Sequence, residues 1–219
     1  MTAETRSLAV VVVCCLALWG LIRLGGEMRE GETLGFDRDL MMALRAPGQP
    51  HVPIGPSWLP DAMRDVTALG STALITLATL TAAAALLYRR RWGRALILLL
   101  VVVLANASDD LLKVFYNRAR PDFAVAGLYI RSQSFPSGHS TASAALWLTL
   151  ATIAASFEAR TDAKLFWFVT AVLAILAVGF SRVYLGAHWP TDVVAGWILG
   201  AMWALIGWAA WKWLSPRSA

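Results

Sequence analysis

Six apolar stretches, each close to the length that a helix needs to cross a bilayer, restrict the fold of this chain most. A helix rising 1.5 Å per residue crosses about 30 Å of hydrocarbon in about 20 residues. Hydrophobic residues make up 58% of the 219 residues and charged residues only 15%. The sequence therefore predicts an all-α integral membrane helical bundle, a single domain over residues 1–219. Its six expected transmembrane helices are Leu8–Leu24, Val66–Tyr88, Ala95–Phe115, Thr141–Phe157, Leu165–Leu185 and Thr191–Leu214.

The basic residues between these stretches indicate how the helices cross the membrane. Basic side chains in short loops stay preferentially in the cytoplasm. In a six-helix arrangement the main basic groups share one side, so we expect a multi-pass protein of the cell (inner) membrane with both termini cytoplasmic. The loops after the first, third and fifth stretches then face outward, to the periplasm. The basic groups are Arg89, Arg90, Arg91, Arg94, Arg160, Lys164, Lys212 and Arg217.

Several other features of the sequence have simple interpretations. The net charge of +5 does not indicate nucleic-acid binding, because the basic residues form no long run or repeated stripe. Cys14 and Cys15 are adjacent, so on a helix they point about 100° apart, and we interpret them as apolar filling. No clear cleavage site follows the first apolar stretch, which we expect to remain as a helix.

The long outer loop, from Gly25 to Asp65, contains one amphipathic segment. Phe36, Leu40, Met41 and Leu44 share a face at helical spacing, which predicts a short helix lying in the membrane interface. Two interpretations of the loop stay open, a packed surface loop and a lid beside a lipid entrance. Five prolines then predict no regular structure before the second transmembrane helix: Pro47, Pro50, Pro53, Pro56 and Pro60.

Nearly all of the unusual polar residues fall in three places that this topology brings to the outer face. The first holds Lys113 and Arg120-Pro121, the second is Pro136-Ser137-Gly138-His139, and the third holds Ser181-Arg182, His188 and Asp192. Their convergence follows from the order of the helices alone.

Lys113, Arg120 and Arg182 supply three cations to this face. Pro121 disfavours helix at Arg120, which we therefore expect at the helix end. A charged side chain near hydrocarbon is costly, and a phosphoryl group is a natural ligand for three of them. Any one of them alone is better explained as a cation at a helix end whose side chain reaches water.

Ser137-Gly138 and the histidines complete the candidate site. Ser137 is a good N-cap, and a helix N-terminus with glycine also presents free backbone N–H groups to an anion. His139 and His188 both begin helices on the outer face, and Asp192 follows His188 by four residues. A carboxylate at that spacing can hold an imidazole in one tautomer, so one histidine can attack phosphorus while the other protonates the leaving oxygen.

These residues resemble the three signature motifs of the type 2 phosphatidic acid phosphatase (PAP2) family. The match is Lys113-x6-Arg120-Pro121, Pro136-Ser137-Gly138-His139 and Ser181-Arg182-x5-His188-x3-Asp192. The resemblance implies His188 as a nucleophile that forms a phosphohistidine, Asp192 as its partner and His139 as general acid. It also implies that no metal or cofactor is needed. The phosphate ligands that it implies are Lys113, Arg120, Ser137, Gly138 and Arg182.

Asp109 and Asp110 lie outside those motifs, one turn before Lys113. An intrahelical ion pair with Lys113 is the simpler interpretation, and contact with a substrate head group is the alternative.

The expected activity is hydrolysis of a lipid phosphate or diphosphate. A transporter is disfavoured because the charges gather at one boundary and the halves show no inverted repeat. The resemblance to small bacterial members favours undecaprenyl diphosphate or phosphatidylglycerol phosphate, with phosphatidate possible. The alternatives are a lipid A phosphatase and a phosphotransferase that moves phosphate between lipids, because a phosphohistidine can be attacked by an alcohol as well as by water.

Overall fold

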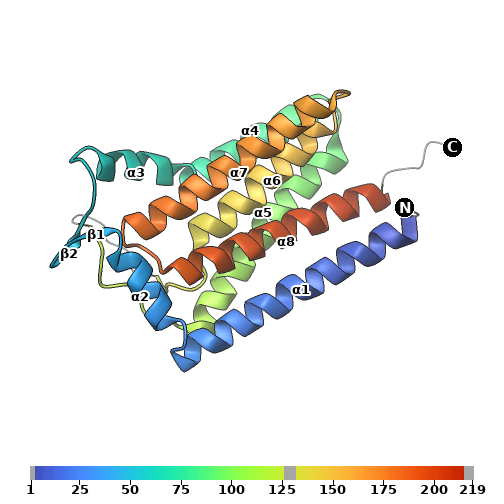
Figure 1. Ribbon diagram of the computed structural model, residues 1–219. Helices are drawn as coiled ribbons and strands as arrows, with labels where there is room; N and C mark the ends of the chain where they lie inside the picture. The colour runs from blue at the N-terminus through green and yellow to red at the C-terminus, as the bar shows by residue number, and fades with distance from the viewer. Residues whose placement is uncertain (1–2, 126–131, 215–219) are drawn as a thin grey trace.

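The computed structural model describes residues 3–125 and 132–214, and its long helices run side by side along one axis (Figure 1). These helices are α1 (Ala3–Glu30), α4 (Thr72–Tyr88), α5 (Trp92–Tyr116), α6 (Gly138–Ala155), α7 (Thr161–Tyr184) and α8 (Pro190–Leu214). Shorter elements gather at one end of the bundle: α2 (Leu34–Met42), β1 (Arg45–Ala46), β2 (Gln49–Pro53) and α3 (Leu59–Ala68).

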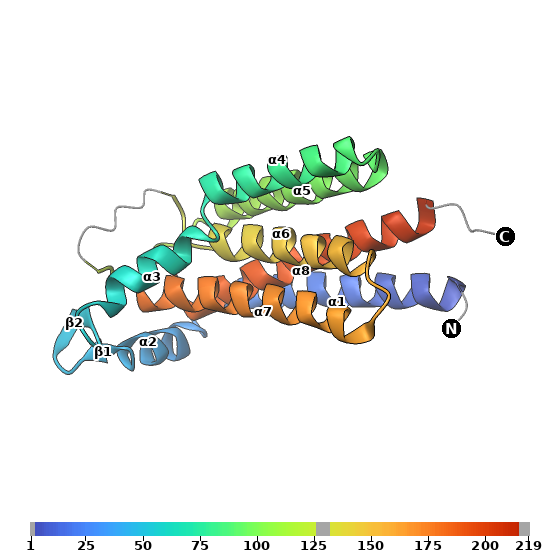
Figure 2. The same ribbon diagram turned by 90° about the horizontal axis from the view of Figure 1, so that it is seen from above.

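The helical membrane bundle predicted from the sequence is confirmed, although the count of six crossings is approximate. By length and composition, five helical segments of the described chain can span a membrane, and α3 with α4 forms one of them. α6 is not among the five, although its 18 residues match the fourth expected helix. The reason is its place at the centre of the bundle, where ten of its residues are buried and few need an apolar surface for lipid (Figure 2).

Close packing of α6 against α8 aligns the starts of these two helices. A Cβ atom at Gly200 would lie 2.3 Å from the carbonyl oxygen of Thr141, and one at Gly196 would lie 2.7 Å from that of Ser137. Small residues therefore let the backbones approach where larger side chains would separate them. The result fixes the Ser137-Gly138-His139 segment beside the start of α8.

The outer segment between α1 and α4 corrects one prediction and confirms another. The short helix around Phe36 is present as α2, with Met41 fully buried and Phe36 63% exposed. The expectation that prolines exclude regular structure is wrong, because a β1–β2 hairpin and α3 occupy this stretch. Pro53 ends β2, and Pro60 lies in the first turn of α3, where a missing N–H costs nothing.

The two ends of the bundle differ in character. The end of α5, the start of α6, the end of α7 and the start of α8 all meet at the end that carries α2, α3 and the hairpin (Figures 1 and 2). The first residues of α1 and the last of α8 lie at the opposite end, together with the turn that carries Arg89, Arg90 and Arg91 and with Arg94 in the first turn of α5. We call these the outer-loop end and the arginine end.

Candidate active site

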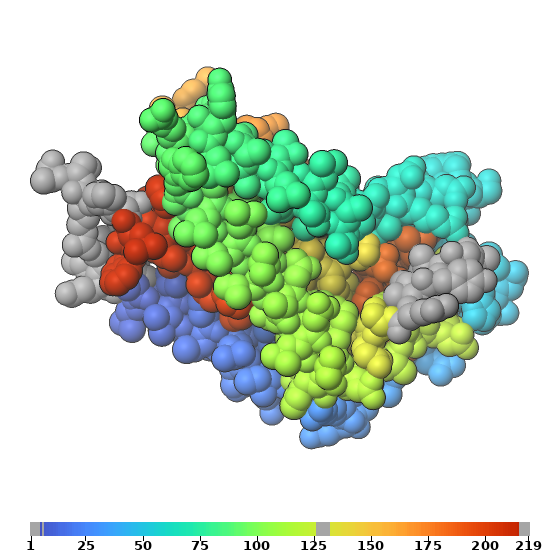
Figure 3. Space-filling view, turned by 180° about the vertical axis from the view of Figure 1, so that it is seen from behind, coloured from blue at the N-terminus to red at the C-terminus, as the bar shows by residue number. Residues whose placement is uncertain are grey.

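A cavity of about 700 Å³ lies at the outer-loop end, between α4, α5, α6 and α7. In the space-filling view, atoms of α6 and α7 are visible in the hollow beside α4 and α5 (Figure 3). Six residues of the three signature motifs line this cavity, although they come from distant parts of the chain. They are Lys113, Arg120, Gly138, His139, Arg182 and His188.

The His188 imidazole is buried, and its contacts define its tautomer. Nδ1 lies 2.8 Å from the carbonyl oxygen of Ser134 and 3.4 Å from Oδ2 of Asp192. Because a carbonyl can only accept, Nδ1 carries the hydrogen and donates it. Nε2 then carries the lone pair, and Nη1 of Arg120 lies 3.0 Å from it. The nitrogen available for attack therefore adjoins a cation of the cavity.

Burial keeps this imidazole neutral. Loss of hydration lowers the pKa of His188 from 6.5 to about 4, while the hydrogen bond and charge of Asp192 oppose the shift. The positive charges of Arg182 and Arg120 lower it further. At neutral pH Nε2 therefore carries no proton that would have to leave before attack, and in this structure its lone pair accepts an N–H of Arg120.

Asp192 lies behind His188, away from the cavity, and is fully buried. Its Oδ2 accepts hydrogen bonds from the Ser134 hydroxyl at 2.5 Å and from the backbone N–H of Trp189 at 2.9 Å. Its Oδ1 lies 2.6 Å from Nη1 of Arg118. This carboxylate is held rigidly, and it holds both Ser134 and the loop that carries His188.

Arg118 and Asp37 belong to this support, and the sequence analysis did not identify either of them. Nη2 of Arg118 lies 2.7 Å from Oδ2 of Asp37 on α2, and Asp37 also accepts hydrogen bonds from the backbone and side chain of Thr191. Arg118 and Asp37 are 8% and 0% exposed. The only sequence signal was an extra arginine two residues before Arg120. These contacts favour the packed-loop interpretation of the outer segment over a lid.

Lys113 reaches the cavity from α5 and pairs with Asp109, as the simpler interpretation predicted. Oδ1 of Asp109 also accepts a hydrogen bond from Thr141 at 3.0 Å, while Asp110 lines the cavity. A Cβ atom at Gly138 would lie 3.2 Å from Nζ of Lys113. Glycine at this position therefore keeps the ammonium close to the start of α6.

Arg120 extends into the cavity from a loop, because α5 ends at Tyr116, with Asn117 in a left-handed conformation (φ 48°) as its cap. The helix thus stops four residues earlier than Pro121 alone suggested. The Arg120 guanidinium donates to the carbonyl oxygens of Ser132 and Ala187 at 2.7 and 2.6 Å. These bonds join the loops before α6 and after α7, so the cation has a fixed position.

Arg182 is 4% exposed and reaches the cavity from the last turn of α7. Its Nη1 donates to the hydroxyl of Thr67 at 3.1 Å. Its Nε is buried and has no hydrogen-bond partner within the described residues. A buried guanidinium N–H without a partner is costly, and an anion in the cavity is a natural acceptor for it.

His139 and Ser137 differ in their relation to the cavity. His139 is half-buried and lines it. Ser137 is fully buried and occupies the N-cap position of α6 in an extended conformation, without a capping hydrogen bond from its side chain. Its hydroxyl accepts a hydrogen bond from the Ser140 hydroxyl at 3.0 Å, and it is not part of the cavity lining. Its role as a phosphate ligand stays a prediction.

The arrangement combines a neutral imidazole nitrogen, a second imidazole and three cations around one space. The cations can neutralise the charge that spreads over the oxygens of a phosphoryl group in transfer, and the two imidazoles can act as nucleophile and proton donor. No group of three or more His, Cys, Asp or Glu side chains within residues 3–125 and 132–214 has the geometry of a metal site.

Comparison with known proteins relates this chain to one family and to individual members of it. The model of the PAP2 superfamily matches residues 94–216. Phosphatidylglycerophosphatase B of Bacillus subtilis is 36% identical over 148 residues, which cover 66% of this chain and 71% of that protein. Undecaprenyl-diphosphatase of Sulfolobus acidocaldarius is 42% identical over 72 residues, which cover 31% of this chain and 29% of that protein.

One solved structure matches almost the whole fold. It is the crystal structure described as the first transmembrane PAP2 type phosphatidylglycerolphosphate phosphatase from Bacillus subtilis. The TM-score is 0.83 at 27% sequence identity, and the match covers 94% of this chain and 98% of that chain.

Proposed function

The chain belongs to the PAP2 superfamily and is a multi-pass membrane lipid phosphatase of this metal-independent family, and we propose that it hydrolyses a lipid phosphate through a phosphohistidine on His188. The proposed roles are nucleophile for His188, positioning carboxylate for Asp192 and proton donor for His139. The proposed phosphate ligands are Lys113, Arg120, Ser137, Gly138 and Arg182.

One observation carries the proposal, namely that a single cavity joins a cluster of charged groups to apolar side chains of the membrane helices. The three cations belong to this cluster, beside Nε2 of His188. Ile75, Val102 and Val103 of α4 and α5 line the same cavity. A phosphate at the charged cluster would leave its acyl or prenyl tail along these apolar residues, beside the lipid. An amphiphile fits this shape better than a soluble phosphate ester does.

The proposed reaction has two steps, and each balances. In the first, the Nε2 lone pair of His188 attacks phosphorus, the bond to the lipid oxygen breaks, and that oxygen takes a proton from His139. In the second, His139 accepts a proton from water, the water oxygen attacks phosphorus, and the P–N bond breaks to release phosphate. The negative charge of the bound phosphate favours the protonated imidazole that His139 needs in the first step.

Phosphatidylglycerol phosphate is the substrate that we favour, with undecaprenyl diphosphate second. The relative named phosphatidylglycerophosphatase B is covered over 71% of its length and the solved phosphatidylglycerolphosphate phosphatase over 98%, whereas the undecaprenyl-diphosphatase is covered over 29%. A lipid A phosphatase and a phosphotransferase stay as alternatives.

A phosphate-release assay on the purified chain tests the choice of substrate. We expect phosphatidylglycerol phosphate to give the highest kcat/KM in a panel with undecaprenyl diphosphate, phosphatidate and lipid A, and activity to persist in EDTA. A labelled phosphate that appears on an added lipid alcohol, and not in water, would identify a phosphotransferase. Absence of activity on every lipid of the panel would contradict the proposed function.

A further inference from the structure

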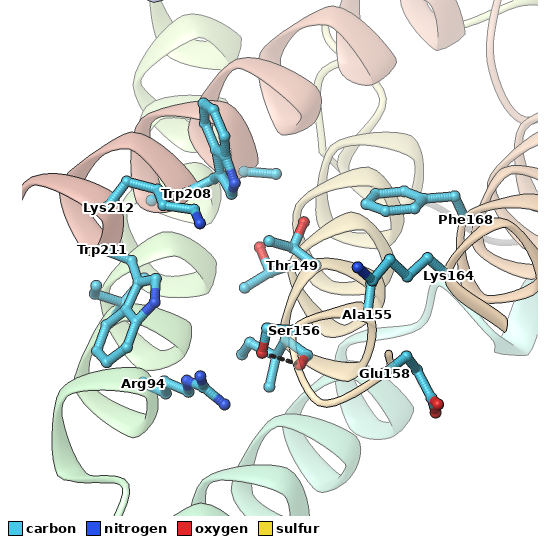
Figure 4. A pocket seen from close by; sticks show the side chains of 15 residues that line it. Arg94, Thr149, Ala155, Ser156, Glu158, Lys164, Phe168, Trp208, Trp211 and Lys212 are labelled. Carbon is cyan, nitrogen blue, oxygen red and sulfur yellow. Dashed lines mark hydrogen bonds between the residues drawn. The ribbon is translucent and has the colours of Figure 1, made fainter. Parts of the chain in front are cut away.

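A second pocket, of about 400 Å³, lies at the arginine end, opposite the catalytic cavity. The start of α5, the end of α6, the start of α7 and the end of α8 surround it (Figure 4). Lys113 follows Arg94 by 19 residues on α5, a rise of roughly 28 Å, which is close to the thickness of the hydrocarbon core. The two pockets therefore lie near opposite membrane boundaries.

Three cations from three different helices converge on this second pocket. Arg94 belongs to α5, Lys164 to α7 and Lys212 to α8. In Figure 4 their charged groups point into the space that the pocket lining encloses. None of the three has an ion-pair partner in the described part of the chain, and Nη1 of Arg94 is buried without a hydrogen-bond acceptor there.

The acidic residue of the pocket lining does not neutralise them. Glu158 accepts a hydrogen bond from Nε1 of Trp167 at 3.3 Å, and its carboxylate turns away from the three cations in Figure 4. The pocket is therefore a concentration of unneutralised positive charge, where a bound anion would form charge-assisted hydrogen bonds.

Aromatic and apolar side chains complete the wall. Trp208 and Trp211 stand on one side and Phe168 on the other, and the Arg94 guanidinium lies 5.0 Å from the Trp211 ring centroid. Indole rings are typical of the level where lipid head groups meet hydrocarbon. Beside the pocket, Leu165 and Phe166 at the start of α7 are more than 60% exposed and offer an apolar surface for acyl chains.

We propose that this basic pocket binds the phosphate of an anionic phospholipid in the leaflet at the arginine end, separate from the substrate of the catalytic cavity. Basic pockets between transmembrane helices are the sites where acidic lipid head groups bind. A role of the cations in membrane orientation alone does not explain their convergence, because the exposed Arg89 and Arg90 already serve that purpose outside the pocket.

Native mass spectrometry of the full chain in detergent tests this proposal. The probes are phosphatidylglycerol and phosphatidylcholine with identical acyl chains. We expect the Lys164→Gln/Lys212→Gln variant to retain at least fivefold less phosphatidylglycerol than the unmodified chain. The Arg90→Gln/Arg160→Gln variant, which loses the same charge at the same end outside the pocket, should retain as much as the unmodified chain.

Further measurements keep the test decisive. Unchanged phosphatase activity in detergent would show that the Lys164→Gln/Lys212→Gln variant is folded. If the double variant is poorly expressed, the Lys212→Gln variant replaces it and should retain at least twofold less phosphatidylglycerol than the unmodified chain. Inorganic phosphate at millimolar concentration should not displace the lipid; if it does, the site takes soluble phosphate and the proposal is wrong. Equal retention of both lipids, or no effect of the lysine substitutions, would also overturn it.

Discussion

At the scale of single residues, the assignment of His188 as nucleophile makes the strongest prediction. The His188→Ala variant should lose at least about 10³-fold in kcat, because no other neutral imidazole in the cavity has its Nε2 beside Arg120. The measurement is phosphate release by purified protein, with thermal unfolding as a check on folding. His51→Ala, an exposed histidine of β2, is the matched control and should be fully active. Retention of more than about a tenth of the activity by His188→Ala would refute the assignment.

His139 is assigned a different role, so its loss should depend on the leaving group. The His139→Ala variant should lose about 10²-fold or more on a lipid phosphate, whose alkoxide must be protonated as it leaves. On nitrophenyl phosphate, whose leaving group is a weak base, the loss should be at least tenfold smaller. Equal losses on the two substrates would argue against proton donation by His139.

The lowered pKa of His188 predicts the acidic limb of the pH profile. With a pKa of about 4 in the folded chain, the imidazole stays neutral as the pH falls from 7 to about 5. After correction for ionisation of the substrate, kcat/KM should therefore stay constant over that range and decrease near pH 4. A limb centred near 6.5 would contradict this assignment.

The same shift affects stability, and the sign follows from linkage. Below pH 6.5 the unfolded chain gains a proton on this imidazole that the folded chain does not bind, so stability decreases between pH 6.5 and about 4. Thermal unfolding at each pH is therefore the necessary control for the activity profile.

The residues that the sequence analysis identified and those that it missed differ in a physical way. Lys113, His139 and His188 stand at ends of apolar stretches, where charged or polar side chains need an explanation. Asp37 stands on an amphipathic helix, where a carboxylate is ordinary, and its partner Arg118 lies 81 residues away in sequence. Only the packing of α2 against the start of α8 brings the two together, and no local pattern encodes that packing.

At the scale of elements, the contact between Asp37 and Arg118 makes α2 part of the support of the active site. The Asp37→Asn variant removes one of the two carboxylates that face Arg118, which keeps its ion pair with Asp192. The expected cost is therefore that of a weakened hydrogen bond to a charged group, about 1.5–3 kcal/mol. We expect a lower unfolding temperature together with a lower kcat. Asp39→Asn, an exposed position on the same helix, is the matched control and should change neither. Equal stability of the two variants would exclude this tethering role.

Secondary structure near the membrane boundary was predictable only in part. The long apolar stretches predicted α1, α5, α7 and α8 to within a few residues at most ends, because a bilayer demands a continuous apolar helix. The hairpin and α3 were missed because a proline excludes structure only where its N–H is needed. Pro60 at the start of a helix and Pro53 at the end of a strand do not meet that condition.

At the scale of the whole molecule, the two pockets divide the bundle by leaflet. The catalytic cavity opens beside α4 and α5 at the outer-loop end, and the basic pocket lies between α5 and α8 at the arginine end. α5 contributes Lys113 to one and Arg94 to the other. The side of the membrane on which each end lies therefore decides which leaflet supplies the substrate and which supplies the second lipid.

The basic residues predict that orientation. Arg89, Arg90, Arg91 and Arg94 occupy six residues with no acidic residue among them, and this short turn should stay in the cytoplasm. The catalytic cavity would then face the periplasm. Two exposed positions test the orientation, namely Ser57 between β2 and α3 and Ala159 between α6 and α7. Each is changed to cysteine in a Cys14→Ala/Cys15→Ala background, which removes the native thiols.

A membrane-impermeant maleimide applied to intact cells should label the Ser57→Cys variant and leave the Ala159→Cys variant unlabelled. Permeabilised cells should label both, which controls for reactivity of the two thiols. The orientation follows because Ser57 lies at the end that carries His188, whereas Ala159 lies in the turn beside Lys164. The reverse pattern would place His188 at the cytoplasmic boundary, so the substrate would have to be a phosphate-bearing lipid of the inner leaflet.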